Sequence, residues 1–178
     1  MKKNGIIIYF TAYGTTKQYA EWISDEIHTK IRSYKEVTDD ELQSSDYLII
    51  GSFVMAHKLI ISKWLSKKEQ ILKNKRLFFY SVSGAKPGTK ELENIFEISL
   101  PESLLKNAKT YQFGGKLRYE DLSGFHKLMI KIGILIEKDP GTKAEMKRDT
   151  KIAKDNINRD YIKPLIQDFD NYINAKKE

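Results

Sequence analysis

The sequence predicts one α/β domain over residues 1–178, an open, doubly wound sheet of five parallel strands with helices on both faces. Three observations support this prediction. Short apolar runs alternate with segments of helical periodicity, which is the pattern of βαβ units. The length falls within the range of a single domain, and neither an internal repeat nor a linker divides it. Small, flexible or hydroxylated residues follow each strong strand, where doubly wound folds collect their ligands.

The first part of the chain supplies two buried strands and a helix between them. Residues 5–10 form a continuous apolar run, which indicates a buried strand. Residues 15 to about 32 carry apolar side chains at helical spacing. Residues 33–37 (SYKEV) are a weak candidate for the edge strand, and residues 39–46 are predicted to be a polar connection. Residues 47–52 form the second buried strand.

The second part of the chain continues the alternation. Residues 58–73 show the apolar face of a helix, and residues 76–83 form a third strong strand. Residues 109–115 form a fourth strand that ends on two glycines. The last segment, about 145–174, is predicted to be a charged amphipathic helix that Pro164 kinks or breaks.

Residues 116–143 do not fit the alternation and are predicted to be an amphipathic insertion after the last strand. Lys127, Lys131 and Lys138 lie beside an apolar stripe at helical spacing. The stripe consists of Phe125, Leu128, Met129, Ile132, Leu135 and Ile136. Two interpretations stay open: the stripe is partly exposed and meets a membrane surface or a large apolar substrate, or it packs on the edge of the sheet.

Composition excludes several classes of chemistry. The chain has no cysteine, which removes disulfides, thiolate metal sites and thiol nucleophiles, and no metal site is expected. No Ser/His/Asp set or carboxylate pair indicates a hydrolase. The net charge of +7 fits either an anionic partner or a lysine-rich surface. Two lysines before a short apolar run do not make a signal peptide, so a cytoplasmic protein is expected.

The segment TAYGTT, residues 11–16, lies between the first strand and the first helix. The first N–H groups of a helix have no intrahelical partners and carry the positive end of the helix dipole. Threonine hydroxyls and Gly14, which permits a sharp turn, would complete a cradle for a phosphate. The alternative is a simple helix cap. The spacing matches neither the P-loop nor the dinucleotide-binding fingerprint.

Three segments that follow strands, TAYGTT, GSFVMAH and SVSGAKPG, resemble the ligand loops of flavodoxin. Longer stretches, namely YLIIGSFVMAHKLIISKWL, RLFFYSVS and YQFGGKLRYEDLSGFHKLMIKIG, are similar to the menaquinone-dependent protoporphyrinogen dehydrogenase branch of flavodoxin-like proteins, which carries an insertion of this kind. The resemblance covers nearly the whole chain. The chain differs from electron-carrier flavodoxins in being basic and in offering a single aromatic residue, Phe53, in its second and third loops.

The resemblance implies FMN as the cofactor and assigns it three groups of residues. The first group would bind the phosphate: Thr11, Tyr13, Gly14, Thr15 and Thr16. The second would form one loop against the flavin ring: Phe53, Val54, Met55, Ala56 and His57. The third would form the other loop: Ser81, Val82, Ser83, Gly84 and Ala85. His57 fits a proton shuttle near the ring or a role in the loop backbone equally well.

The function expected from these features is FMN-dependent redox chemistry, in which the flavin carries the electrons. The resemblance implies a protoporphyrinogen dehydrogenase-like activity with a quinone as acceptor. The first interpretation of the stripe adds peripheral contact with the inner face of the cell membrane through residues 116–143. One alternative is a soluble flavodoxin electron carrier that serves a redox partner protein. A nucleic-acid-binding module is less favoured, because no aromatic residues interleave with a basic strand face.

Overall fold

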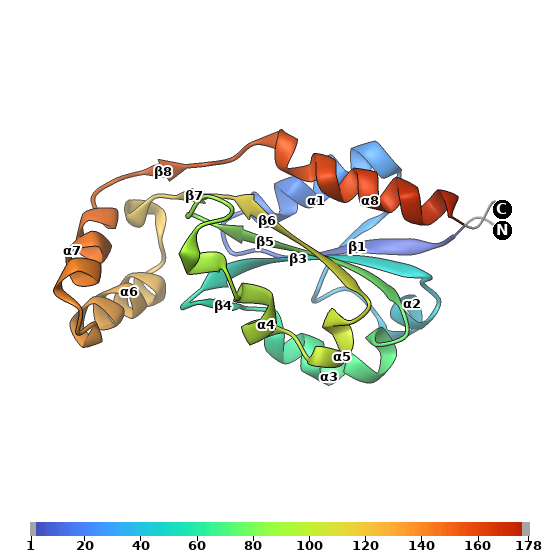
Figure 1. Ribbon diagram of the computed structural model, residues 1–178, viewed down its shortest axis with the longest axis horizontal. Coiled ribbons are helices and arrows are strands. Elements are labelled where there is room, and N and C mark those ends of the chain that lie inside the picture. Colours follow the sequence, from blue (N-terminus) through green and yellow to red (C-terminus); the bar gives the residue numbers. More distant parts are fainter. Residues whose placement is uncertain (1–2, 176–178) are drawn as a thin grey trace.

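The computed structural model describes residues 3–175, which are built around a parallel sheet (Figure 1). Its five parallel strands, in spatial order, are β2 (Ile31–Ser33), β1 (Gly5–Phe10), β3 (Tyr47–Met55), β5 (Arg76–Ser83) and β6 (Ala108–Gly114). A short strand, β4 (Lys58–Leu59), pairs antiparallel with the end of β3. Numbered without β4, the order is 2-1-3-4-5, the flavodoxin-like order of doubly wound sheets. The predicted fold class is therefore confirmed.

Helices cover both faces of the sheet. α1 (Thr15–Ile27) and α8 (Lys163–Asn174) lie on one face, and α3 (Ser62–Leu72), α4 (Ile95–Ser99) and α5 (Glu102–Leu105) lie on the other (Figure 1). Side chains alternate across each strand, so Ile7 belongs to the core under α1 and α8, whereas Ile6 and Ile8 belong to the opposite core. Short 3-10 turns occupy Lys90–Leu92, Tyr119–Asp121 and Arg159–Ile162.

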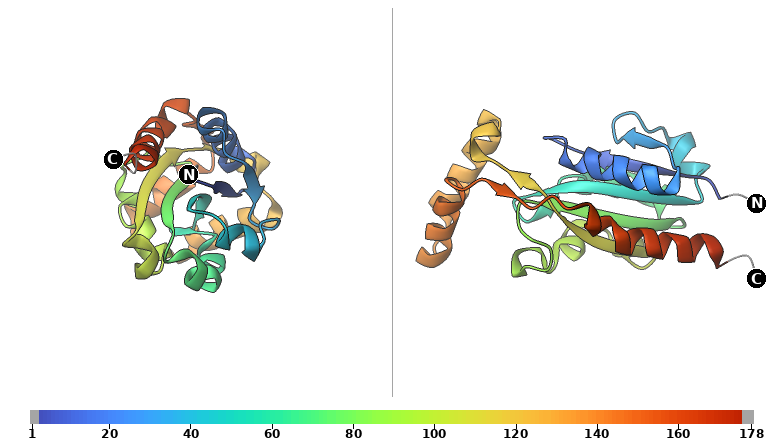
Figure 2. Two further views of the ribbon diagram at one scale, coloured as in Figure 1. Left: turned by 90° about the vertical axis from the view of Figure 1, so that its right-hand side faces the viewer. Right: turned by 90° about the horizontal axis from the view of Figure 1, so that it is seen from above.

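The insertion forms a separate structure that we call the hairpin, residues 116–155. Its base is an antiparallel pair of short strands, β7 (Lys116–Leu117) and β8 (Lys154–Asp155). Its body consists of two helices, α6 (Gly124–Ile136) and α7 (Pro140–Asp149). The hairpin projects beyond the carboxyl ends of the parallel strands, and both chain termini lie at the other end of the sheet (Figures 1 and 2).

The end of the first helix and the edge strand differ from the prediction. α1 ends at Ile27, because His28 adopts a left-handed conformation with φ 54° and its N–H donates to the Ser24 carbonyl. The edge strand is Ile31–Ser33 rather than 33–37, since Ile31 pairs with Ile7 and packs against the core. The prediction of a helix to about residue 32 was therefore wrong, and a tertiary contact decides the strand.

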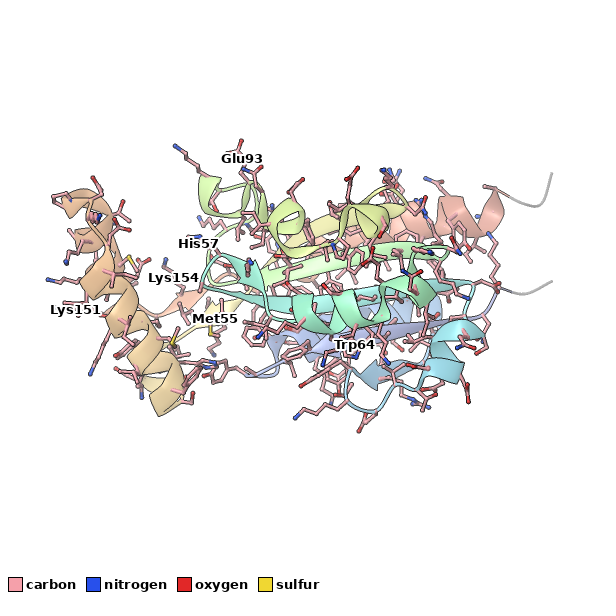
Figure 3. All side chains as sticks on the ribbon, turned by 90° about the horizontal axis from the view of Figure 1, so that it is seen from below. Met55, His57, Trp64, Glu93, Lys151 and Lys154 are labelled. Atoms are coloured by element: carbon pink, nitrogen blue, oxygen red, sulfur yellow. The ribbon has the colours of Figure 1, made fainter. Side chains whose placement is uncertain are left out.

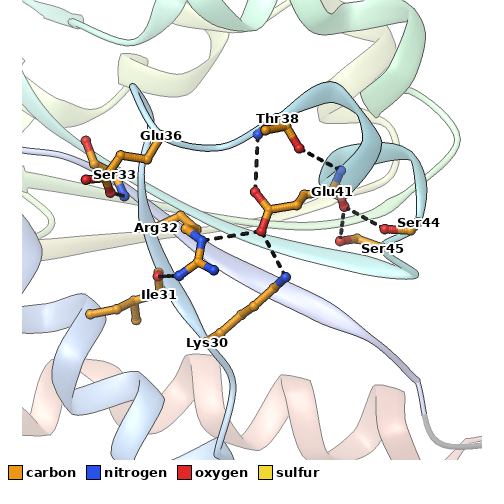
Figure 4. Close-up of polar contacts among 9 residues, drawn as sticks. All are labelled: Lys30, Ile31, Arg32, Ser33, Glu36, Thr38, Glu41, Ser44 and Ser45. Atoms are coloured by element: carbon orange, nitrogen blue, oxygen red, sulfur yellow. Dashed lines mark hydrogen bonds and ion pairs between the residues drawn. The ribbon is translucent and has the colours of Figure 1, made fainter.

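The polar connection predicted at residues 39–46 was also wrong, because it contains a helix, α2 (Asp39–Gln43). Thr38 caps this helix by accepting from the Glu41 N–H, and the Glu41 carboxylate accepts from the Thr38 N–H in return (Figure 4). The same carboxylate accepts from Lys30 and Arg32. The hydrogen bond from Lys30, followed by that from Thr38, lowers the pKa of Glu41 below its usual value.

Three further predicted elements differ in their bounds from the structure, each for a local reason. β3 continues to Met55, because Val54 and Met55 pair with β4, and this delays the predicted 58–73 helix until Ser62. The long helix predicted over about 145–174 is two helices joined by an extended segment that includes β8. Pro164 lies in the first turn of α8, where a missing N–H costs nothing, and it does not kink a helix.

Candidate functional site

The carboxyl ends of β1, β3 and β5 lie side by side, which brings the three predicted segments to one edge of the sheet. Phe10 at the end of β1 is level with Ser52 of β3, and Ser52 is level with Ser81 of β5. In the flavodoxin-like strand order, ligands bind outside these ends, at the switch point between the first and third strands.

The first segment, residues 11–16, forms an open turn before α1. Gly14 adopts φ 89°, and its N–H donates to the Thr11 hydroxyl over 2.9 Å. An added Cβ on Gly14 would meet nothing within 4 Å, so the turn opens onto free space. No side chain caps the start of α1, and its first turn contains no acidic residue. An uncapped helix start with threonines beside it fits a phosphate group.

The residues of this segment differ in their access to a ligand. Tyr13 is 46% exposed, Gly14 is exposed, and Thr11 and Thr15 are half-buried. Thr16 is only 1% exposed, so it is the least accessible of the five predicted phosphate ligands. The Thr16 carbonyl accepts a hydrogen bond of 2.9 Å from the Tyr80 hydroxyl. Thr16 therefore joins the turn to the core of the sheet.

Tyr80 and Gly51 support the site, although neither was predicted to do so. The Tyr80 ring is buried and lies over Gly51, where any Cβ would overlap it. Burial raises the pKa of Tyr80, which keeps its hydroxyl protonated as the donor to Thr16. A glycine inside a strand often marks such a close approach, so Gly51 was the signal in the sequence that could have revealed this contact.

The second segment, residues 53–57, is the end of a strand and a tight two-residue turn rather than an open loop. Phe53, Val54 and Met55 belong to β3, and Ala56 and His57 form the turn into β4. Both turn residues have positive φ, 49° and 56°. Two-residue turns of this kind normally use Asn-Gly, since a Cβ is strained there. Met55 and His57 lie at the end of the sheet that faces the hairpin (Figure 3).

The third segment, residues 81–85, is partly inside β5. Ser81 is 0% exposed and Val82 is 4% exposed, so their side chains face the interior. Ser83, Gly84 and Ala85 follow at the surface and are half-buried. The Ser83 hydroxyl accepts from the Ala85 N–H over 3.1 Å and holds this turn. Three of the five predicted residues thus remain accessible to a ligand.

The described part of the chain, residues 3–175, contains no helix long and apolar enough to cross a membrane. Within the same residues, no group of histidine and acidic side chains is arranged to hold a metal ion.

An uncapped helix start at the switch point of a doubly wound sheet is the arrangement that fits a phosphate-bearing ligand. A family profile described as a flavodoxin domain matches residues 6–143, which is most of the chain. The chain belongs to this family. The three segments predicted this membership. The branch within the flavodoxin-like proteins is part of the function that we propose.

Solved structures of similar fold share little sequence with this chain. A flavodoxin from the domain Archaea has 18% identity and a TM-score of 0.47, and the match covers 72% of this chain and 95% of that one. Oxidised flavodoxin 2 from Bacillus cereus has 19% identity and a TM-score of 0.49, with 72% and 98% covered. A flavoprotein in complex with FMN from Lactobacillus acidophilus has 18% identity and a TM-score of 0.45, with 63% and 92% covered. Among curated proteins, none matches this chain.

Proposed function

We propose that this protein is an FMN-dependent oxidoreductase that passes electrons between a large apolar substrate and a quinone at a membrane surface. The proposed activity is that of the menaquinone-dependent protoporphyrinogen dehydrogenases, which the sequence resembles. Membership of the flavodoxin domain family supports FMN as the cofactor. When bound, FMN supplies one- and two-electron transfer, and the protein supplies binding and orientation.

The residues of the site divide into a phosphate group and a ring group. The uncapped start of α1, with Thr11, Gly14 and Thr15, would hold the phosphate through N–H groups and hydroxyls. Phe53 to His57 on one side and Ser83 to Ala85 on the other would flank the ring. Phe53 is half-buried and would supply the aromatic surface of the segment 53–57.

The observation that carries the proposal beyond a simple electron carrier is the exposed stripe of α6. Its six apolar residues, Phe125, Leu128, Met129, Ile132, Leu135 and Ile136, are between 37% and 75% exposed. No residue of α6 is buried. The stripe is therefore exposed, which supports contact with a partner more than packing on the edge of the sheet.

α7 leaves the stripe uncovered because it packs against another side of α6. The half-buried positions of α6 are His126, Lys127, Ile130, Gly133 and Ile134. A Cβ on Gly133 would lie 3.4 Å from the Met146 methyl group. At 100° per residue these positions fall outside the arc of the stripe. A contiguous apolar face of this kind marks a site of interaction with a membrane or an apolar ligand.

Charge around the stripe favours an anionic surface as its partner. Lys131 and Lys138 are exposed beside it, whereas Lys127 donates to the Glu120 carbonyl over 2.8 Å. Lysines that flank an apolar helix face contact lipid head groups and contribute ~1 kcal/mol each near an anionic surface. Residues of the stripe would enter the head-group region of the membrane and place the FMN site next to the membrane surface.

The redox part of the proposal is tested by reconstituting the protein with FMN, reducing it anaerobically and adding a menaquinone analogue. We expect rapid reoxidation of the bound flavin, and oxidation of protoporphyrinogen coupled to it. A reduced flavin that the quinone leaves unchanged would favour the alternative, an electron carrier that serves a partner protein.

The membrane part is tested by co-sedimentation with vesicles that contain anionic phospholipid. Binding should be salt-sensitive and should be lost in the double variant Lys131→Glu/Lys138→Glu. Lys67→Glu/Lys90→Glu is the matched control, because it makes the same change in net charge at exposed residues of the sheet domain. Equal loss of binding in both variants would show that net charge, and not the hairpin, attracts the vesicles.

A further inference from the structure

The hairpin contacts each of the three predicted FMN segments. At its base, Leu117 packs against Gly84 of the third segment, where an added Cβ on Gly84 would lie 2.8 Å from the Leu117 Cβ. Directly after the hairpin, the Asn156 amide donates to the Gly84 carbonyl over 2.8 Å. At the start of α6, the His126 ring lies against the Phe53 ring of the second segment, with their centroids 6.4 Å apart. The same His126 contacts Tyr13 of the first segment. The insertion is therefore attached to the site at several points.

The contacts of Tyr13 form a directed chain of hydrogen bonds. The Ser123 N–H donates to the Tyr13 hydroxyl over 3.1 Å, and that hydroxyl is hydrogen-bonded to Nδ1 of His126. A phenol has one proton, so an oxygen that accepts from Ser123 still has a proton to donate to Nδ1. The Ser123 hydroxyl also accepts from the His126 N–H over 3.3 Å, which fixes the first turn of α6.

We propose that His126 is a positioning residue of the FMN site, supplied by the hairpin. It accepts a hydrogen bond from the Tyr13 hydroxyl while its ring lies against Phe53, and so links the tip of the phosphate segment to the second segment. Without this partner, Tyr13 would extend from an open turn in which an added Cβ on Gly14 meets nothing within 4 Å. The hairpin would thus keep the phosphate segment in the conformation that binds the cofactor, in addition to its proposed contact with a membrane.

This inference rests on the proposed binding of FMN but assigns a role that the proposed function does not need. An FMN site could consist of the sheet-edge segments alone, with the hairpin attached as an independent membrane contact. The two possibilities differ in one measurable quantity, which is the dependence of FMN affinity on the Tyr13–His126 pair.

The test is a double-mutant cycle on FMN affinity, measured by quenching of FMN fluorescence with the full chain. We expect His126→Ala and Tyr13→Phe each to weaken FMN binding roughly tenfold, the effect of about one lost hydrogen bond. Because one residue acts through the other, the double variant should be no weaker than the weaker single variant. His126→Asn, which retains an acceptor near the position of Nδ1, should recover most of the affinity.

The controls separate this role from general damage to the fold. Lys151→Ala, an exposed residue elsewhere on the hairpin, should retain wild-type affinity. The thermal unfolding midpoint should be unchanged in His126→Ala, since no residue of α6 is buried. Wild-type affinity in His126→Ala, or effects that multiply in the double variant, would overturn the inference and leave the proposed function standing. A wild-type protein that takes up no FMN would overturn both.

Discussion

The sheet domain and the hairpin contain apolar residues in similar density but use them differently. In the sheet domain, the buried apolar side chains that fill the two cores, one on each face of the sheet, are 0% to 6% exposed. In the described structure of the hairpin, Leu122 near the base is 8% exposed, and no apolar side chain from residue 123 to residue 155 is buried. Burial of apolar surface drives folding, so the sheet domain accounts for the stability of the molecule. The apolar stripe of the hairpin contributes little to it, which leaves the stripe available for a partner.

The largest expected effect is the difference in stability loss between two truncations, one in each region. Phe79 is 1% exposed in a core of the sheet domain, and Phe79→Ala should lower the free energy of unfolding by ~3–5 kcal/mol. Leu135 is 75% exposed on α6, and Leu135→Ala should change it by less than ~0.5 kcal/mol. Urea unfolding followed by circular dichroism measures both. A loss above 2 kcal/mol for Leu135→Ala would contradict the comparison.

The next effect concerns the bond that joins the phosphate segment to the sheet. Tyr80→Phe leaves the Thr16 carbonyl without its buried donor, which should cost ~1–3 kcal/mol of stability and also weaken FMN binding. Tyr119→Phe, at the start of the hairpin, is the matched control and should alter neither. Normal FMN affinity in Tyr80→Phe would show that the turn before α1 does not depend on this support.

A third prediction concerns the free energy of unfolding at high pH. Burial raises the pKa of Tyr19 to about 12, while its hydroxyl donates to the Gly114 carbonyl at the base of the hairpin. Because the unfolded chain releases this proton near pH 10, the contribution of Tyr19 is fully present below pH 10 and is lost as the pH rises to about 12. Tyr19→Phe should therefore flatten this part of a plot of unfolding free energy against pH. An unchanged slope would contradict the assignment.

The smallest effect should be a gain in stability. Ala56 has φ 49° in the turn between β3 and β4, a conformation that costs less for glycine. Ala56→Gly should stabilise the protein by roughly 0.5–1 kcal/mol. Ala85→Gly is a useful comparison, since Ala85 has no positive φ and should gain nothing. If both variants are equally destabilised, the turn is not strained.

These contrasts also explain which parts of the structure could be predicted from the sequence. Strands 5–10 and 76–83 were predicted at their observed bounds, because continuous apolar runs belong to strands buried on both faces. The edge strand and the end of α1 were not, since the pairing of Ile31 with Ile7 and the left-handed His28 depend on tertiary structure. The helix at residues 39–43 was missed although Thr38 and Glu41 carry the spacing of a capping box.

The candidate site was predictable as three segments but not in its internal contacts. Helical spacing identified the stripe of α6, yet only the structure could show that α7 packs elsewhere and leaves it exposed. The contact between Tyr13 and His126 joins residues 113 positions apart, and no local pattern predicts such a pair. The burial of Ser81 and Val82 likewise follows from where β5 ends.

The central claim, that residues 11–16 and the start of α1 hold the phosphate of FMN, is tested most directly by comparing ligands. Titration of the protein with FMN, riboflavin and FAD, followed by flavin fluorescence, measures the three affinities under the same conditions. We predict that FMN binds at least about a hundredfold more tightly than riboflavin, because riboflavin lacks the phosphate and its charge-assisted hydrogen bonds, and that FAD binds no better than FMN. Equal affinity for riboflavin and FMN would contradict the claim and reduce this segment to an ordinary turn before a helix.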